Sequence, residues 1–124
     1  MQSGHKTILI ADDDVAIVDS MAAILDFAGY EVLQVFDGTS VIESVKAKPD
    51  LVILDIAMGG HNGLMVCRQL KRQVRTQHIP VLIMSAGHNV EEKAFEAGAD
   101  DFLAKPFDMD MLQQRVSNLL LKTA

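Results

Sequence analysis

Short apolar runs recur five times along the chain, and they alternate with segments of a different pattern. Each run has four or five residues, and most of the runs are rich in Val, Ile and Leu and show little alternation with polar residues. This pattern is typical of strands that are covered on both faces of a sheet. The predicted strands are Thr7–Ala11, Glu31–Val35, Leu51–Leu54, Pro80–Met84 and Asp101–Ala104.

Between the predicted strands, apolar residues recur every three or four positions, as they do on the buried stripe of an amphipathic helix. The first helix is expected to begin after Asp14, which is a good N-cap residue, and to stop at Gly29. Asp108 is the expected N-cap of the last helix. Three helices between these are expected around residues 41–45, 64–73 and 90–97.

The alternation of strand and helix, repeated five times, predicts an α/β fold. Parallel strands joined by right-handed helical crossovers form a doubly wound (βα)5 sandwich of three layers. The expected strand order is the flavodoxin-like 2-1-3-4-5, although periodicity alone does not determine it. We expect one domain over residues 7–121, an N-terminal extension over 1–6, and a tail or the start of a linker over 122–124.

Composition narrows the function classes. The chain has 124 residues, which suits one domain, and its net charge of −6 disfavours direct binding to nucleic acid. Its one cysteine, Cys67, makes neither an intrachain disulfide nor a zinc site of paired cysteines. No apolar run approaches the length of a membrane span, and residues 1–6 do not resemble a signal peptide. A cytoplasmic protein without membrane contact is predicted.

Polar residues follow four of the five predicted strands. In an open parallel sheet, ligands bind beyond the carboxyl ends of the strands, and these ends share one edge. The residues expected to meet there are Asp12, Asp13 and Asp14 after the first strand, Asp55 after the third, Ser85 after the fourth and Lys105 after the fifth.

The charges of this group predict a metal site. Two carboxylates about 4 Å apart repel by about 4 kcal/mol at an effective dielectric constant near 20, so cations are needed beside them. Lys105 supplies one, and a hard divalent cation such as Mg²⁺, or Mn²⁺, suits the remaining carboxylates. A carboxylate beside such a cation is a potential nucleophile towards a phosphoryl group. Asp55 stands alone after its strand and is the better candidate for the nucleophile, whereas Asp12 and Asp13 are better suited to be metal ligands.

Four motifs in order along the chain resemble the receiver domain of two-component response regulators, the CheY-like family. They are Ile8-Leu9-Ile10-Ala11-Asp12-Asp13-Asp14, Leu51-Val52-Ile53-Leu54-Asp55 with Gly63 eight residues on, Ile79-Pro80-Val81 leading to Ser85-Ala86, and Gly98-Ala99-Asp100-Asp101-Phe102-Leu103-Ala104-Lys105-Pro106-Phe107. The resemblance covers nearly the whole chain. It implies a phosphorelay protein whose only covalent chemistry is its own Mg²⁺-dependent phosphorylation and dephosphorylation.

The resemblance also implies the roles of particular residues. Asp55 would accept a phosphoryl group from a histidine kinase or a histidine phosphotransfer protein. Asp12 and Asp13 would hold Mg²⁺ together with the Asp55 carboxylate and the backbone carbonyl of Ala57.

Three further residues would respond to the phosphoryl group. Ser85 would donate its hydroxyl to a phosphoryl oxygen, Lys105 would pair with the phosphate, and Phe102 would be the switch aromatic that turns inward. The resemblance also predicts a cis peptide bond between Lys105 and Pro106, which is rare outside X-Pro sequences.

The chain departs from the family pattern at several positions. Gly59 stands where a proline is usual and Asn62 where an aspartate is common, and both changes concern the rigidity of a loop. Phe102 lacks the hydroxyl of the frequent tyrosine, which should favour its inward position. Ala57 and Gly87 occupy positions that tune the lifetime of the acyl phosphate, and both are too small to position an attacking water.

Two charged groups of residues have both structural and functional interpretations. The surface of the fourth and fifth strand–helix units resembles a dimerisation face of winged-helix transcription regulators, although a solvated face is an equally good interpretation. Its residues are Lys93, Glu96, Asp101 and Arg115. A basic cluster is better explained by cations near a helix C-terminus. Its members are Arg68, Lys71, Arg72 and Arg75.

Two other functions are compatible with parts of the pattern. In a haloacid dehalogenase-like phosphatase, Asp12 would be the nucleophile and Asp14 the acid, although Ala16 and the short chain disfavour this class. A flavodoxin-type FMN module lacks support because no Ser/Thr/Gly-rich phosphate loop follows the first strand. The three aspartates could also simply cap a helix, and Asp14 is the best candidate for that role.

Overall fold

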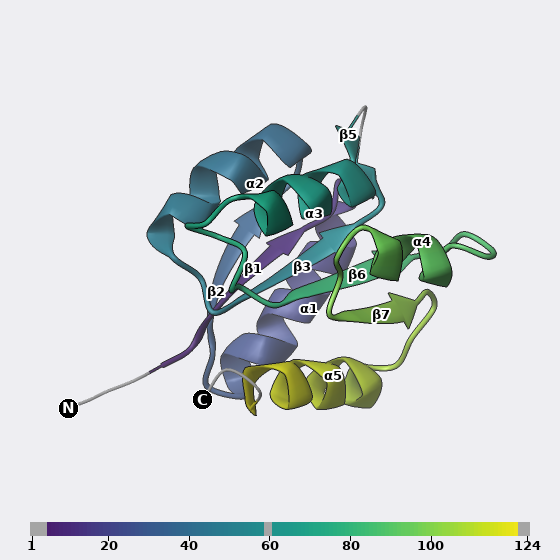
Figure 1. The fold of residues 1–124 in the computed structure, drawn as a ribbon. Helices are drawn as coiled ribbons and strands as arrows, with labels where there is room; N and C mark the ends of the chain where they lie inside the picture. Colours follow the sequence, from purple (N-terminus) through teal and green to yellow (C-terminus); the bar gives the residue numbers. More distant parts are fainter. Residues whose placement is uncertain (1–4, 59–60, 122–124) are drawn as a thin grey trace.

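The chain folds around one five-stranded parallel sheet (Figure 1). This computed structural model describes residues 5–58 and 61–121. The strands of the main sheet are β1 (Thr7–Ala11), β2 (Glu31–Val35), β3 (Leu51–Asp55), β6 (Val81–Ser85) and β7 (Asp101–Ala104). Their order is β2-β1-β3-β6-β7. This is the predicted order 2-1-3-4-5, which is therefore confirmed.

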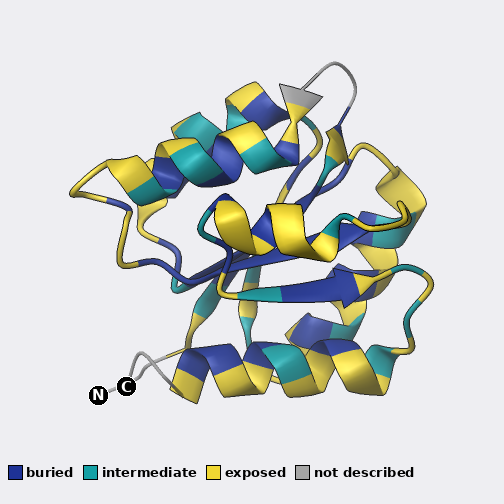
Figure 2. Ribbon diagram, turned by 45° about the vertical axis from the view of Figure 1, so that its right-hand side comes forward, coloured by how far each residue is buried: buried dark blue, intermediate teal, exposed yellow. Residues whose placement is uncertain are grey.

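Helices cover both faces of the sheet, as predicted for a doubly wound fold (Figures 1 and 2). They are α1 (Val15–Phe27), α2 (Gly38–Ser44), α3 (Gly63–Arg72), α4 (Glu91–Glu96) and α5 (Met109–Leu121), and the short 3-10 helix η1 (Val45–Ala47) follows α2. Buried residues of α1 and α5 share one core cluster, and those of α2, α3 and α4 share the other. The sheet separates these two clusters.

The burial of the strands explains their continuous apolar pattern. Successive side chains of a strand point to opposite faces. In β1, Ile8 and Ile10 therefore pack under α1 and α5, whereas Leu9 packs on the other face. Every residue of β3 and β6 is buried. Polar alternation is absent because neither face of the central strands meets water.

Helix boundaries agree with the predicted capping residues. The Asp14 carboxylate accepts hydrogen bonds from the backbone N–H groups of Ala16 (3.1 Å) and Ile17 (3.3 Å). Asp108 likewise accepts from the N–H of Met111 at 2.8 Å. Gly29 ends the α1 turn at a φ of +100°, a left-handed conformation that glycine adopts without strain.

Several boundaries differ from the predicted ones. Strand β6 begins at Val81 rather than Pro80, because proline has no N–H to donate to the ladder. Both Asp55 and Ser85 are the last residues of their strands rather than residues that follow them. The sequence also did not predict η1 or the antiparallel pair of β4 (Ala57–Met58) and β5 (His61–Asn62). Elements of two or three residues are too short to show a periodic pattern.

Some predictions concern residues outside the described part of the chain. Gly59 lies there, as do residues 1–4 of the predicted N-terminal extension and all of the predicted tail, 122–124. Over the described residues, none of the helices has both the length and the apolar character needed to cross a bilayer.

Candidate functional site

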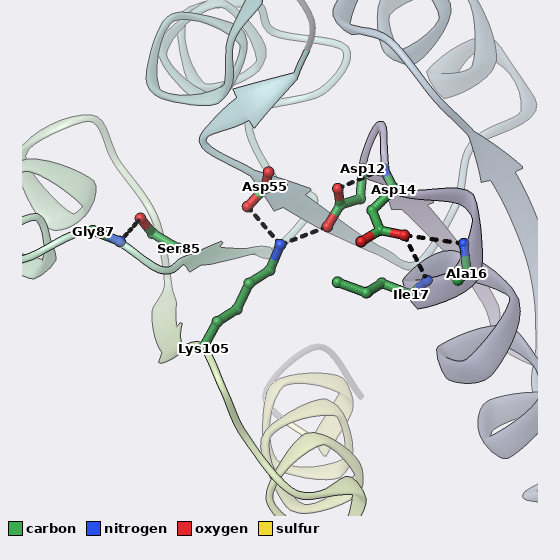
Figure 3. A network of polar contacts seen from close by, with 8 residues as sticks. All are labelled: Asp12, Asp14, Ala16, Ile17, Asp55, Ser85, Gly87 and Lys105. Atoms are coloured by element: carbon green, nitrogen blue, oxygen red, sulfur yellow. Dashed lines mark hydrogen bonds and ion pairs between the residues drawn. The ribbon is translucent and has the colours of Figure 1, made fainter.

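The polar residues predicted to meet at the carboxyl edge of the sheet come from four different strands (Figure 3). Asp12 follows β1, Asp55 ends β3, Ser85 ends β6 and Lys105 follows β7. The β7 strand is separated from β3 by β6, so the long side chain of Lys105 must reach across the end of β6. Its ammonium group thereby lies among the carboxylates of the inner strands.

Lys105 forms ion pairs with two buried aspartates. Its Nζ lies 2.7 Å from Oδ2 of Asp12 and 3.0 Å from Oδ1 of Asp55. Asp12 is 1% exposed and Asp55 is 6% exposed. Buried carboxylates require charge partners and hydrogen bonds. The ammonium group of Lys105 serves both aspartates, and the Asp12 carboxylate also accepts a hydrogen bond from the N–H of Asp14 at 3.0 Å.

The carboxyl group of Asp55 is harder to ionise than an ordinary aspartate. Burial is the main cause of its raised pKa, and repulsion from Asp12 and Asp13 adds to it, while the hydrogen bond from Lys105 acts in the opposite direction. The pKa of Lys105 is also raised. Burial disfavours its charged form, but the bonds to Asp12 and Asp55 outweigh that cost.

A raised pKa in the folded state makes Asp55 a source of instability at neutral pH. The folded protein holds this proton more tightly than the unfolded chain, so stability falls as pH rises from the unfolded aspartate value, near 3.9, through the folded pKa. The variant Asp55→Asn should therefore have a higher free energy of unfolding than the unmodified protein at pH 7. Urea unfolding of both proteins at pH 7 and near pH 3.5 measures this, and the gain should shrink at the lower pH. An equal or lower stability of the variant at pH 7 would contradict it.

Three aspartates have the arrangement of a cation site. One carboxylate oxygen from each of Asp12, Asp13 and Asp55 lies within 4.8 Å of the other two. Asp12 and Asp55 are buried, whereas Asp13 is exposed and leaves the cluster open to solvent. Hard oxygen ligands of this kind fit Mg²⁺, and the single charge of Lys105 does not balance three carboxylates. Ala57, the predicted carbonyl ligand, lies two residues beyond Asp55 in β4.

Two further residues predicted to respond to a phosphoryl group lie on the neighbouring strands β6 and β7. The Ser85 hydroxyl is buried and accepts a hydrogen bond from the N–H of Gly87 at 2.9 Å. Phe102 lies on β7 opposite Ile83 of β6 and is only 9% exposed, so its ring is packed inward. The Lys105–Pro106 peptide bond is cis, as predicted.

The structure gives a physical reason for the glycine eight residues after Asp55, Gly63, which the sequence alone did not explain. Its N–H donates a hydrogen bond to the carbonyl of Ile56 at 2.7 Å, so the start of α3 closes tightly on the end of β3. A Cβ atom at this position would overlap the backbone carbonyl oxygen of Asp55. Only glycine allows this approach, and the motif therefore positions the backbone of Asp55.

Asp14 adjoins the cluster, and its backbone N–H donates a hydrogen bond to the Asp12 carboxylate at 3.0 Å, but its own carboxylate is not one of the three that lie together. Its carboxylate is engaged by the first amides of α1 (Figure 3). The structure thus gives Asp14 the role of a helix cap, the role that the sequence favoured for it.

The four residues of the possible dimer face lie on adjacent elements, and two of them already form contacts within the chain. Asp101 and Arg115 form an ion pair of 3.1 Å within the chain, and Arg115 also donates to the carbonyl of Phe102 at 2.6 Å. Lys93 and Glu96 are exposed on α4. Arg115 therefore links α5 directly to the strand that carries the predicted switch residue.

The fold and the acidic edge define a class: a doubly wound α/β domain with an aspartate–lysine site at the ends of β1, β3 and β7. The sequence profile of the response regulator receiver domain matches residues 8–117. The chain belongs to this family and is a receiver domain of two-component signalling. Nothing in the comparisons supports the phosphatase interpretation based on Asp12 and Asp14.

Similar proteins agree with this assignment. The DNA-binding dual master transcriptional regulator RpaA of Synechocystis sp. is 43% identical over 119 residues, which are 94% of this chain and 49% of that protein. Response regulator MprA of Mycobacterium ulcerans is 39% identical, over 94% of this chain and 50% of its own length. The chain spans about half the length of these curated relatives.

Solved structures show the same architecture. A response regulator structure from Chloroflexus aurantiacus matches with a TM-score of 0.90 at 32% identity, over 95% of this chain and 99% of that chain. The chemotaxis response regulator CheY4 of Vibrio cholerae matches with a TM-score of 0.86 at 25% identity, over 94% and 99% of the two chains. The predicted CheY-like fold is confirmed.

Proposed function

We propose that Asp55 accepts a phosphoryl group from the phosphohistidine of a sensor histidine kinase or a histidine phosphotransfer protein. The observation that carries the proposal is the position of Asp55, which is buried at the carboxyl edge and 3.0 Å from the Lys105 ammonium group. One carboxylate oxygen of Asp55 attacks phosphorus, and the bond from phosphorus to the imidazole nitrogen breaks. The imidazole leaves with the electron pair, and Asp55 becomes an acyl phosphate.

Asp12, Asp13 and Asp55 would hold Mg²⁺, with the backbone carbonyl of Ala57 as a further ligand. The support is the cluster of three carboxylates whose ligand atoms lie within 4.8 Å of one another. When bound, the cation neutralises charge on the carboxylates and on the phosphoryl oxygens. Mn²⁺, which also prefers oxygen ligands, would occupy the same site.

Lys105, Ser85 and Phe102 would convert phosphorylation into a conformational change. Lys105 already bridges Asp12 and Asp55, and it would pair with the phosphoryl group as charge is added there. Ser85 would exchange its bond with Gly87 for one to a phosphoryl oxygen. Movement of Ser85 affects Phe102, which lies on the neighbouring strand, and shifts the population of states at the surface of α4, β7 and α5.

This surface would transmit the signal to an output domain or a partner. The relatives are about twice as long as this chain, and RpaA is a DNA-binding regulator, so an output domain outside the present chain is part of the proposal. A phosphorylation-dependent homodimer would use Lys93, Glu96, Asp101 and Arg115. The domain itself would bind neither membranes nor nucleic acid and would act in the cytoplasm.

Mapping the acyl phosphate tests the proposed nucleophile. After incubation with Mg²⁺ and acetyl phosphate, peptide mass spectrometry should place the modification on Asp55. Reduction of the acyl phosphate with borohydride marks the modified aspartate permanently. A label on Asp12 would refute the proposal and restore the phosphatase interpretation.

A further inference from the structure

A second candidate binding site lies at the edge of the sheet opposite to Asp55. A pocket of about 600 Å³ is lined by residues that precede β3 and β6 and by residues of α2 and α3. The loops that form it lie at the amino ends of the strands, to the left in Figure 1. Because a strand of five residues is roughly 16 Å long, the sheet separates this pocket from the acidic cluster.

The floor of the pocket is apolar and well packed. Val45, Leu70 and Ile79 line it and are 7%, 1% and 3% exposed. Thr76 also lines the pocket. Its hydroxyl donates a hydrogen bond to the carbonyl of Leu70 at 2.6 Å and so provides a partner for a carbonyl group near the end of α3. The volume and the apolar floor are those of pockets that take small organic molecules.

The rim of the pocket is cationic although the chain as a whole is acidic. Three of the eleven lysine and arginine residues line it, Lys46, Lys48 and Arg75, together with His78. Within the described part of the chain, no aspartate or glutamate belongs to the lining. All four basic residues are exposed. The rim thus presents positive charge around an apolar floor.

These cations are available to a ligand. Among the residues that the structure describes, the side chains of Lys48 and Arg75 form no hydrogen bond or ion pair. Lys46 pairs with Glu43 at 3.1 Å, but both side chains are more than two-thirds exposed, and such surface pairs are weak. A bound anion can therefore recruit all three without breaking a buried contact.

We propose that this pocket binds a small organic anion, with its apolar body on the floor and its carboxylate, phosphate or sulfonate group at the basic rim. A cation of the same shape would be repelled, and a neutral molecule would gain only the apolar contacts. The site is independent of phosphorylation at Asp55, since none of its residues belongs to the acidic cluster.

The probe for the test is 8-anilinonaphthalene-1-sulfonate, compared with uncharged N-phenyl-1-naphthylamine. The sulfonate should bind saturably to the folded protein and shift the amide NMR signals of residues 42–48 and 73–79. The uncharged amine should bind at least about tenfold more weakly, which corresponds to about one charge-assisted contact. Equal affinity of the two probes, signal shifts centred elsewhere, or no saturable binding would overturn the proposal.

A double variant tests the role of the rim. Lys48 has a left-handed φ of 59°, which asparagine tolerates, so Lys48→Asn combined with Arg75→Gln removes two charges without strain. The affinity for the sulfonate should fall at least about tenfold. The matched control, Lys6→Asn with Arg72→Gln, makes the same change outside the pocket and should stay within about twofold, because separated surface charges are screened.

The comparison of the two double variants separates a local effect from one of net charge. If the control loses as much affinity as the pocket variant, the effect is one of net charge and the proposal is wrong. Asp55→Asn should bind the sulfonate as the unmodified protein does. Failure of the pocket proposal therefore leaves the phosphorylation proposal untouched, and the reverse also holds.

Discussion

Asp55→Asn should abolish the incorporation of a phosphoryl group from acetyl phosphate in the presence of Mg²⁺. We expect the rate to fall by at least about 100-fold, which is the scale of losing a nucleophile rather than a neighbouring contact. An amide is a poor nucleophile, and the nearby carboxylates cannot replace it if Asp12 and Asp13 hold the metal. Intact-mass spectrometry over a time course gives the rate directly.

Asp14→Asn is the matched control for this experiment. It removes one negative charge at the same edge of the sheet, and asparagine caps a helix as well as aspartate does, so α1 should be retained. The control should be labelled within about twofold of the unmodified protein. Loss of labelling in folded Asp14→Asn, or unchanged labelling in Asp55→Asn, would contradict the assignment of the nucleophile.

Asp13→Asn should weaken Mg²⁺ binding by at least about tenfold, a change of about 1.4 kcal/mol in binding free energy. The variant removes one of the three charges of the cluster. Asp13 is exposed, so the fold should not depend on it. Calorimetric titration with Mg²⁺ measures the affinity, and circular dichroism checks the fold. The concentration of Mg²⁺ that gives half-maximal phosphorylation should rise in proportion.

Asp108→Asn controls for the loss of one charge from an acidic chain. Asp108 caps α5 and lies outside the carboxylate cluster, and asparagine preserves the cap. This variant should bind Mg²⁺ with unchanged affinity. Equal affinities of Asp13→Asn and Asp108→Asn would show that Asp13 is not part of the metal site.

Most of the acidic site was predictable because strand ends are visible in a sequence. Asp12, Asp55, Ser85 and Lys105 each stand at the end of a strongly apolar run, and the carboxyl ends of parallel strands share one edge. Carboxylates that share one edge repel one another, so a cation could be predicted among them before any distance between them was known. The strand order was expected from the five strand–helix units of a doubly wound fold, and the resemblance to receiver domains added the roles of the residues.

The partners of Lys105 could not be predicted in the same way. Its Nζ bonds to both Asp12 and Asp55, and this depends on how far a side chain reaches across the end of β6. The pairing of Asp101 with Arg115 similarly depends on the packing of α5 against β7. Both contacts join residues from different elements, and periodicity contains no information about such distances.

The contacts of the basic cluster near the end of α3 also could not be predicted from the sequence. Its residues were best explained as cations at the end of a helix, but the ammonium group of Lys71 bonds to the carbonyl of Ile79 at 2.7 Å and to Asp100 at 2.8 Å, and both partners lie outside that helix. Arg75, in contrast, lines a pocket with Lys46 and Lys48, which are far from it along the chain. Only the crossover that brings the end of α2 beside the end of α3 creates that pocket.

The alternation of buried strands with amphipathic helices, the caps of α1 and α5, and the gathering of acidic residues at one edge could all be predicted from the sequence. These features depend on local periodicity and on residue type, both of which can be read along the chain. Three other features became visible only in the folded protein: the carboxylates that share the Lys105 ammonium group, the need for glycine at position 63, and the pocket with an apolar floor and a cationic rim. Each of these depends on distances of a few ångströms between segments that are remote in sequence, and such distances exist only once the strands are ordered and packed.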